Sequence, residues 1–424
     1  MIDETHRATE AVWRIEAPKL IAALVRLVGD VGLAEELAQD ALVAALEQWP
    51  REGVPNKPAA WLMATAKHRA IDAIRRQRRL QEKHEVLGRE LEVQPLGVPE
   101  LEAVLEDTPI SDDLLRLVFI ACHPVLSMDA RVALTLRLLG GLTTDEIAHA
   151  FLVPEPTIAQ RIVRAKRTLA EAHVPFEVPS TDELSERLSA VLEVIYLVFN
   201  EGYSASAGDY WTRPALCEDA LRLGRVLAEL MPNEPEVHGL VALMEIQASR
   251  LRARLSPSGE PILLLDQNRA LWDQLLIRRG LAALRRAERL GLALGPYALQ
   301  AAIAACHARA RTAEETDWVR IAALYDALSE VTPSPVVELN RAMAVAMAYG
   351  PATGLEVADA LASEPSLKTY YVLPNVRGDL LFRLGRFAEA AAEFERAATL
   401  TRNARQREVL RGRAAQARNA AEDA

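Results

Sequence analysis

Apolar residues recur along most of this chain at intervals of three and four, and this spacing constrains the fold more than any other feature. It places apolar side chains on one face of a helix, whereas a half-buried strand needs strict alternation. Alanine, leucine, arginine and glutamate dominate the periodic segments, and runs of β-branched residues are scarce. Prolines and glycines fall between these segments, where they interrupt helices. The sequence therefore predicts an all-α fold.

Composition divides the chain into four successive parts. Residues 1–80 have helical spacing and end in a basic cluster, which predicts a first helical bundle. Residues 81–111 are rich in acids and contain three prolines, which predicts a linker. Residues 112–174 form a second, compact helical unit, and residues 181–424 form a long helical remainder. At about 100–200 residues per domain, a chain of this length is expected to contain two to four domains.

The last part of the chain has the spacing of a tetratricopeptide unit over residues 371–404. Small and aromatic residues recur there at Gly378, Leu381, Gly385, Phe387, Ala390, Phe394 and Ala397. The small residues would allow two helices to approach closely, and the two phenylalanines would fill the space between them. We therefore expect the C-terminal part to be an array of tetratricopeptide-like helical hairpins, with this unit as its clearest member.

The net charge of the chain limits how it can contact nucleic acid. With a net charge of −10, it is not expected to coat DNA or RNA over its whole surface, so any DNA contact must come from local basic patches. Its three cysteines are far apart, which excludes a Cys-x-x-Cys metal motif and suits a reducing cytoplasm. Neither a secretory signal nor an apolar stretch long enough to span a bilayer is apparent. We expect a cytoplasmic protein without membrane contact.

Residues 140–169 have the pattern of a helix-turn-helix. Either Thr143 or Thr144 can cap the first helix, and Asp145 and Glu146 follow in its first turn, where the helix dipole favours acids. After a tight connection, Pro156 stands at the start of a second helix with one apolar side and one basic side. The second helix of such a motif enters the major groove of DNA. An ordinary helical hairpin with a solvated basic face is the alternative interpretation.

Two further surfaces precede this motif. From Trp61 to Leu80 there are six Lys or Arg residues against one acid, and most of them lie off the apolar stripe of the expected helix. Such a cluster either binds DNA phosphates or is a solvated face. Arginines near the C-terminus of a helix are stabilised by the helix dipole whatever the function of the helix. Residues 33–49 are expected to form an amphipathic helix whose exposed side carries acids. That acidic side is either solvated or a docking face for a basic partner helix.

In this order, the three features resemble a sigma factor of the extracytoplasmic-function group within the sigma-70 family. Residues 33–49 are similar to the polymerase-docking helix of region 2, and residues 60–76 are similar to the segment that reads the −10 promoter element. Residues 142–169 are similar to region 4, which reads the −35 element. The remainder resembles the subgroup with a long C-terminal extension that ends in tetratricopeptide-like repeats, on the strength of residues 198–205, 266–269 and 339–342.

The resemblance implies a role for individual residues. Those implied for binding the polymerase core are Glu36, Gln39, Asp40 and Glu47. Those implied for the −10 element are Asn56, Lys57, Trp61, Lys67, His68, Arg69, Arg75 and Arg76. Those implied for the −35 element are Thr157, Gln160, Arg161, Arg164 and Lys166. Trp61 would either stack on DNA or lie in the core together with Trp49.

The implied partners are promoter DNA and the RNA polymerase core, which would be contacted through its β′ clamp helices and its β flap. We expect residues 181–424 to regulate the factor, either through an unidentified protein or ligand that binds them or by packing against regions 2 and 4. The sequence has no catalytic arrangement, because Cys122 and His123 are adjacent and point in different directions on a helix. We therefore predict no enzymatic activity, no cofactor and no metal.

Two rival interpretations stay open. The first is a helix-turn-helix regulator that contains a small-molecule receptor in its C-terminal helices, with an aromatic pocket. The residues considered for that pocket are Tyr203, Tyr210, Trp211 and Trp272. The second is a tetratricopeptide scaffold whose helix-turn-helix only looks like a DNA reader.

Overall fold

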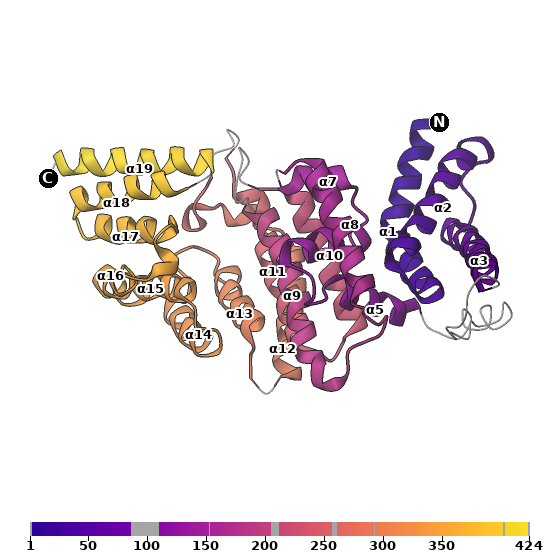
Figure 1. Ribbon diagram of the computed structural model, residues 1–424. Coiled ribbons are helices and arrows are strands. Elements are labelled where there is room, and N and C mark those ends of the chain that lie inside the picture. The colour runs from indigo at the N-terminus through magenta and orange to yellow at the C-terminus, as the bar shows by residue number, and fades with distance from the viewer. Residues whose placement is uncertain are drawn as a thin grey trace. The chain divides into compact units, whose positions relative to one another are not determined.

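The structure is a computed structural model that describes residues 2–85, 110–151, 153–204, 212–256, 261–291, 293–401 and 403–422. Within these ranges every regular element is a helix, apart from a single bridge between Leu255 and Pro261 (Figure 1). The prediction of an all-α fold is confirmed. The chain divides into two compact units, Met1–Leu197 and Val198–Ala424.

The first unit contains two groups of helices and most of a long connecting helix. The first group is α1 (Ile2–Val28), α2 (Val31–Glu52) and α3 (Pro58–Glu85). The second group is α5 (Ile110–Ala121), α6 (Met128–Leu138), α7 (Thr144–Phe151) and α8 (Glu155–Glu171). The connecting helix is α9 (Thr181–Tyr203), which continues into the second unit.

Helices α1, α2 and α3 pack on one another as a three-helix bundle. Leu24 from α1, Ala34 from α2 and Leu62 from α3 are almost completely buried in it. Helix α2 begins at a favourable cap, because the Asp30 carboxylate accepts a hydrogen bond of 2.7 Å from the Leu33 amide. Helix α3 continues to Glu85, five residues beyond the boundary expected at 80. Residues 86–109, most of the predicted linker, lie outside the described residues.

The second unit is a series of helices in which each packs mainly on its neighbours in the chain. Its α-helices after α9 are α10 (Pro214–Leu230), α11 (Pro235–Ala248), α12 (Gln274–Leu290), α13 (Pro296–Arg309), α14 (Trp318–Val331), α15 (Pro335–Tyr349), α16 (Pro351–Ala360), α17 (Val372–Arg383), α18 (Phe387–Leu400) and α19 (Ala404–Glu422). The short 3-10 turns are η1 (Leu251–Ala253), η2 (Leu264–Asp266), η3 (Arg269–Leu271) and η4 (Pro365–Leu367).

Helices α17 and α18 form the hairpin expected from the repeat spacing. A Cβ atom added to Gly378 would lie only 2.7 Å from Cε1 of the Phe394 ring, so only glycine fits at this crossing. Phe394 and Ala390 are fully buried, whereas Phe387 is only partly buried and packs edge-on against Phe382. The close approach at Gly378 agrees with the spacing argument. Assignment of the hairpin to the tetratricopeptide repeats stays a prediction.

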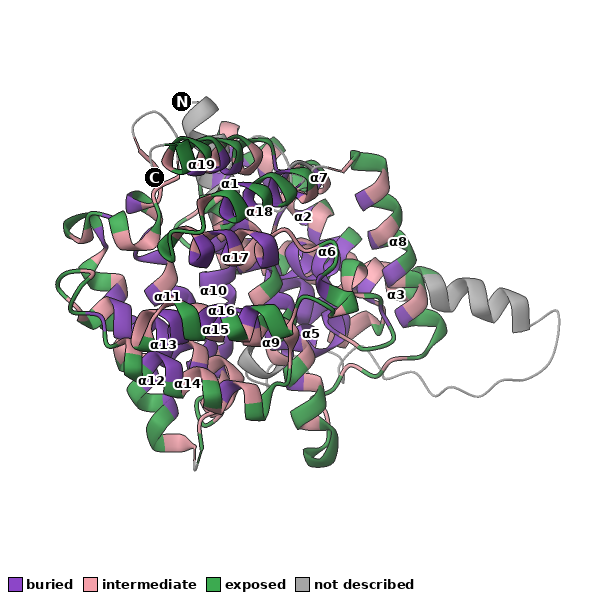
Figure 2. Ribbon diagram, turned by 90° about the vertical axis from the view of Figure 1, so that its left-hand side faces the viewer, coloured by how far each residue is buried: buried purple, intermediate pink, exposed green. Residues whose placement is uncertain are grey.

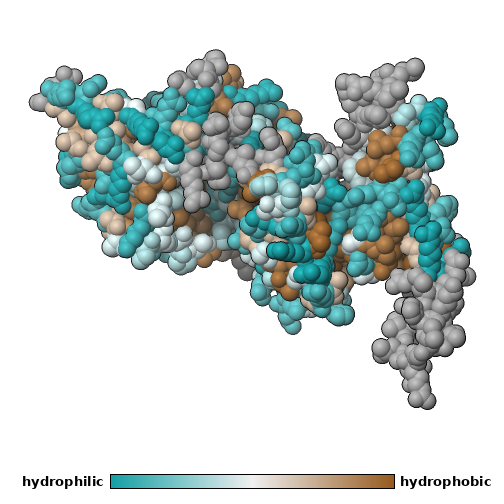
Figure 3. Space-filling model, turned by 45° about the horizontal axis from the view of Figure 1, so that its top comes forward, coloured by the Kyte–Doolittle hydropathy of each residue, from teal (hydrophilic) through white to brown (hydrophobic). Residues whose placement is uncertain are grey.

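The described helices include none that combines the length and the apolar character needed to cross a membrane. Hydrophilic residues cover much of the face shown in Figure 3.

Candidate nucleic-acid interface

Helices α7 and α8 form the helix-turn-helix that the sequence predicts. The Thr143 hydroxyl accepts a hydrogen bond of 3.1 Å from the Glu146 amide, and the Glu146 carboxylate accepts one of 2.7 Å from the Thr143 amide. This reciprocal pair is a capping box, which fixes the first turn of α7. Helix α8 then starts at Glu155, with Pro156 in its first turn. Proline is well tolerated there, because first-turn amides have no partner within the helix.

Helix α8 has one buried face and one exposed face (Figure 2). Ile158, Ile162, Ala165 and Leu169 are buried against the rest of the unit. Gln160 and Arg164 are exposed on the opposite side, and Val163 between them is also exposed. The amide of Gln160 and the guanidinium of Arg164, groups of the kind that can pair with base edges, therefore lie on the exposed face.

The other predicted −35 residues are less open. Thr157 is partly buried. Arg161 forms an ion pair of 2.9 Å with Asp129 of α6, and Lys166 forms an ion pair with Glu35 of α2. These two cations are already held by carboxylates, so Gln160 and Arg164 are the better placed of the five for DNA.

The predicted −10 residues lie on α3 and on the short connection before it. Asn56 and Lys57 are exposed in the connection between α2 and α3. His68, Arg75 and Arg76 are exposed on α3, and Lys67 and Arg69 are half-buried. The structure thus places most of this group on one helix and its preceding turn.

The position of Trp61 agrees in part with each of the two interpretations, stacking on DNA and packing in the core. Trp49 is 2% exposed and belongs to the bundle core. Trp61 packs edge-on against it, with ring centroids 5.5 Å apart, but remains partly exposed. The packed edge anchors the ring at the start of α3, and the rest of the ring is accessible to a partner.

The acidic side of α2 carries the residues predicted to bind polymerase. Glu36, Asp40 and Glu47 are exposed, and Val43, which falls between the last two, is 51% exposed. Asp40 also forms an ion pair of 3.2 Å with Arg69 of α3, so one predicted polymerase contact is joined to one predicted DNA contact. Gln39 is half-buried and donates a hydrogen bond to Glu35.

Glu35 is a site residue that the sequence argument missed. Glu35 is only 3% exposed, yet its carboxylate forms ion pairs with Arg137 of α6 and Lys166 of α8. It also accepts a hydrogen bond from Gln39 of its own helix. Its carboxylate therefore joins the bundle of α1–α3 to the helix-turn-helix unit. A signal was available in the sequence, because Glu35 stands four residues after Val31 and three before Ala38, on the buried face of α2.

A second ion pair joins the same two groups of helices. Arg26 of α1 lies 3.0 Å from the Asp113 carboxylate of α5, which is 1% exposed. Arg116 reaches the same carboxylate from one turn further along α5. Each junction thus has a buried carboxylate that faces two basic side chains.

Cys122 and His123 do not form a reactive pair. The Cys122 thiol is buried against the Thr135 hydroxyl at 3.3 Å, and this burial raises its pKa to about 11. The pKa of His123 is lowered to about 4, first by burial and then by Arg187 and Arg131. A protonated thiol beside a neutral imidazole is not an activated nucleophile. Within the described part of the chain, no three His, Cys, Asp or Glu side chains are grouped to hold a metal ion.

Comparisons with known protein families match three stretches of the chain. The sigma-70 region 2 family matches residues 13–80, which contain most of α1–α3, and the sigma-70 region 4 family matches residues 116–169, which contain most of α5–α8. A family of unknown function, DUF6596, matches residues 187–288, from α9 to α12. No solved structure matches the chain.

Two curated proteins are similar to this chain. The uncharacterized protein R00370 of Rhizobium meliloti (strain 1021) is 44% identical over 396 residues, which cover 93% of this chain and 92% of the relative. The ECF RNA polymerase sigma factor SigK of Mycobacterium ulcerans (strain Agy99) is 27% identical over 155 residues, which cover 36% of this chain and 78% of the relative. The two sigma regions, in this order and followed by a long helical extension, show that the chain belongs to the sigma-70 family as an ECF-type sigma factor with a C-terminal extension.

Proposed function

We propose that this protein directs RNA polymerase to promoters by reading the −35 element with α8 and the −10 element with α3. The observation that carries the proposal is the exposure of Gln160 and Arg164 on the outer face of the second helix of a helix-turn-helix. An arginine or glutamine in this position makes paired hydrogen bonds to base edges in the major groove.

In region 2, we propose that the acidic side of α2 docks on the β′ clamp helices of the polymerase while region 4 contacts the β flap. Asn56 and Lys57 would line the pocket for a base extruded from the melted −10 element. Unstacking a base costs a few kcal/mol, so the protein must supply such a pocket or a stacking surface in return. Lys67, Arg75 and Arg76 would hold backbone phosphates.

Run-off transcription with purified core polymerase tests this function. The chain should give a transcript with one defined start on its own promoter, whereas core polymerase alone should not. Arg164→Ala should weaken promoter binding about tenfold to a hundredfold, since a bidentate base contact contributes about 1–3 kcal/mol. Arg167→Ala is the matched control, because Arg167 lies on the same helix and pairs with Glu171 instead. A chain that leaves core polymerase inactive at every promoter tested would exclude the proposal.

We further propose that residues 181–424 regulate the factor through a protein or ligand that binds them. Support comes from size, because the whole second unit lies beyond the two regions that match promoter-binding families. A chain that ends at Pro179, before α9, should differ from the full chain in promoter-dependent transcription. Circular dichroism must first establish that the shortened chain is folded. Equal transcript yields from both folded chains would count against regulation by the extension.

The rival interpretation of a helix-turn-helix regulator predicts a different outcome of the same assay. Such a regulator binds its operator without core polymerase and does not set a start site. Promoter binding that is independent of polymerase, without a new transcript, would favour it.

A further inference from the structure

A cavity of about 670 Å³ opens in the second unit. Its described lining comes from the end of α9, from residues near η1 and η2, and from the start of α17 and the helix α19. Among the described residues, the charged side chains of this lining are three arginines, Arg250, Arg254 and Arg413, and none of the lining residues is an acid. Cavities of about 300–1,000 Å³ are the usual size for small-molecule sites.

Two of these arginines carry an uncompensated charge. Among the described residues, neither Arg250 nor Arg254 forms an ion pair, and the Nε atoms of both are buried without a hydrogen-bond partner. Arg250 is only 8% exposed. Burying a guanidinium without a counter-charge is unfavourable, so the site is poised to receive an anion. Arg413 differs from this pair, because its guanidinium is joined to Asp379 and Asn375.

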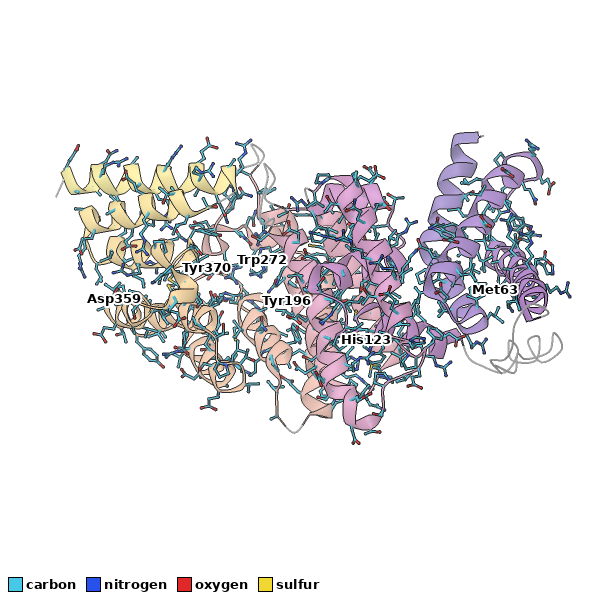
Figure 4. All side chains as sticks on the ribbon, viewed as in Figure 1. Met63, His123, Tyr196, Trp272, Asp359 and Tyr370 are labelled. Atoms are coloured by element: carbon cyan, nitrogen blue, oxygen red, sulfur yellow. The ribbon has the colours of Figure 1, made fainter. Side chains whose placement is uncertain are left out.

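Aromatic rings hold the two unpaired guanidinium groups in place. The Arg254 guanidinium lies 3.8 Å from the centre of the Tyr203 ring. The Arg250 guanidinium lies 5.9 Å from the ring centres of both Tyr203 and Trp272. Trp272, which is labelled in Figure 4, is 3% exposed. Such cation–π contacts orient a guanidinium without neutralising it. Both side chains are thus held in position and keep their N–H donors available.

The rest of the lining is mixed. The Gln267 side chain is 8% exposed and donates to the Ile262 carbonyl, while its Oε1 atom has no hydrogen-bond partner. Across the cavity, the Tyr371 hydroxyl accepts a hydrogen bond from Gln406. Apolar side chains complete the wall at Leu255, Pro261, Ile262, Leu264, Val409 and Leu410. The cavity therefore offers two cationic donors, one free amide acceptor and an apolar surface.

We propose that this cavity binds a small organic anion, whose phosphate or carboxylate groups pair with Arg250 and Arg254 and whose apolar body lies against the opposite wall. Arginine matches both oxyanions through paired N–H donors. The unpartnered Gln267 oxygen would accept a hydroxyl or amino group of the same molecule. The inference concerns binding alone and does not depend on the proposed promoter function.

Calorimetric titration of the full chain, without polymerase and in phosphate-free buffer, tests the inference with three probes. Phenyl phosphate and phthalate each join an apolar ring to oxyanions, and benzyl alcohol is their uncharged counterpart. At least one of the two anions should bind, and benzyl alcohol should not. Which anion binds more tightly distinguishes a phosphate site from a carboxylate site. An absence of heat from both anions up to about 10 mM, a concentration beyond ordinary site affinities, would overturn the inference.

Three variants locate the binding. Arg254→Gln should weaken the bound anion about tenfold or more, because it removes a charged donor. Val409→Trp should do the same by filling the cavity with the arginines intact, which keeps the test valid if Arg254→Gln disturbs the fold. Arg285→Gln is the matched control, because Arg285 is an exposed arginine of α12 outside the lining. Equal affinities in all four proteins would mean that binding occurs elsewhere, and the inference would fail.

Discussion

At the scale of single residues, Glu35 shows how one buried carboxylate organises the first unit. Glu35 forms ion pairs with Arg137 and Lys166 from two helices of region 4. Lys166, which the family resemblance assigns to DNA, is therefore held by a carboxylate of region 2. The ion pair turns Lys166 towards region 2, so a DNA phosphate would compete with the Glu35 carboxylate for this cation.

Glu35→Gln should lower the free energy of unfolding by about 2–3 kcal/mol, because it removes the charge that balances two partly buried cations. Thermal or urea denaturation measures the change. Glu36→Gln is the control on the same helix, since Glu36 is exposed, and its stability should stay within about 0.5 kcal/mol of the parent chain. Equal losses in both variants would show that Glu35 has no special structural role.

The lowered pKa of His307 makes the stability of the second unit depend on pH. Burial, together with the nearby charges of Arg250 and Arg269, lowers its pKa to about 4 from the ordinary 6.5. Between these two pH values the unfolded chain binds a proton that the folded chain does not. The stability from this residue is therefore complete above pH 6.5 and is lost as the pH falls towards 4.

The free energy of unfolding that His307 contributes should fall by about 3 kcal/mol over this pH range. Denaturation at a series of pH values measures the free energy of unfolding, and its slope against pH is compared between the parent chain and a variant. In His307→Gln, the fall in stability below pH 6.5 should be less steep than in the parent chain, whatever stability the variant has at neutral pH. Parallel curves for the two proteins would contradict the assignment.

At the scale of elements, the hairpin of α17 and α18 depends on a glycine that permits close packing. Gly378→Ala would place a methyl group against the Phe394 ring, and we expect a loss of about 1–3 kcal/mol. Gly412→Ala is the opposite case, because Gly412 lies in α19 with nothing near its missing Cβ. That change should stabilise the chain by about 0.5–1 kcal/mol, as alanine does in an exposed helix. Melting temperatures that move in the same direction would refute the packing argument.

The elements themselves were largely predictable from the sequence, because their signals are local. The spacing of apolar residues, with a threonine before the first turn of α7 and Pro156 in the first turn of α8, indicated both helices without any tertiary information. Glu35 was not identified, because its partner Arg137 stands 102 residues away and no local pattern reports a pairing of that range. The cavity was foreseen only through Tyr203, one of four aromatic residues considered for a pocket. Trp272 is not among the lining residues but contacts Arg250, which is, and Tyr210 and Trp211 lie outside the described residues.

At the scale of the whole molecule, α9 belongs to both units, and Leu197 marks the boundary within it. Its first half contacts α5, where Arg187 donates to the Phe119 carbonyl, and its second half contacts α10, where the Cys217 thiol donates to the Phe199 carbonyl. Each unit thus uses a different half of one continuous helix.

Leu197→Pro should uncouple the two units, because proline within a helix removes a hydrogen bond and costs about 3 kcal/mol. We expect calorimetry to resolve two unfolding transitions in this variant. Leu197 is 41% exposed, so Leu197→Ala should keep the profile of the parent chain. A single unshifted transition in Leu197→Pro would show that continuity of α9 is unimportant.

Helix α9 also ends at Tyr203, whose ring forms part of the arginine-lined cavity. The ring of this last residue of the helix lies against the Arg254 guanidinium. An anion held by the two arginines would therefore also immobilise the last turn of α9.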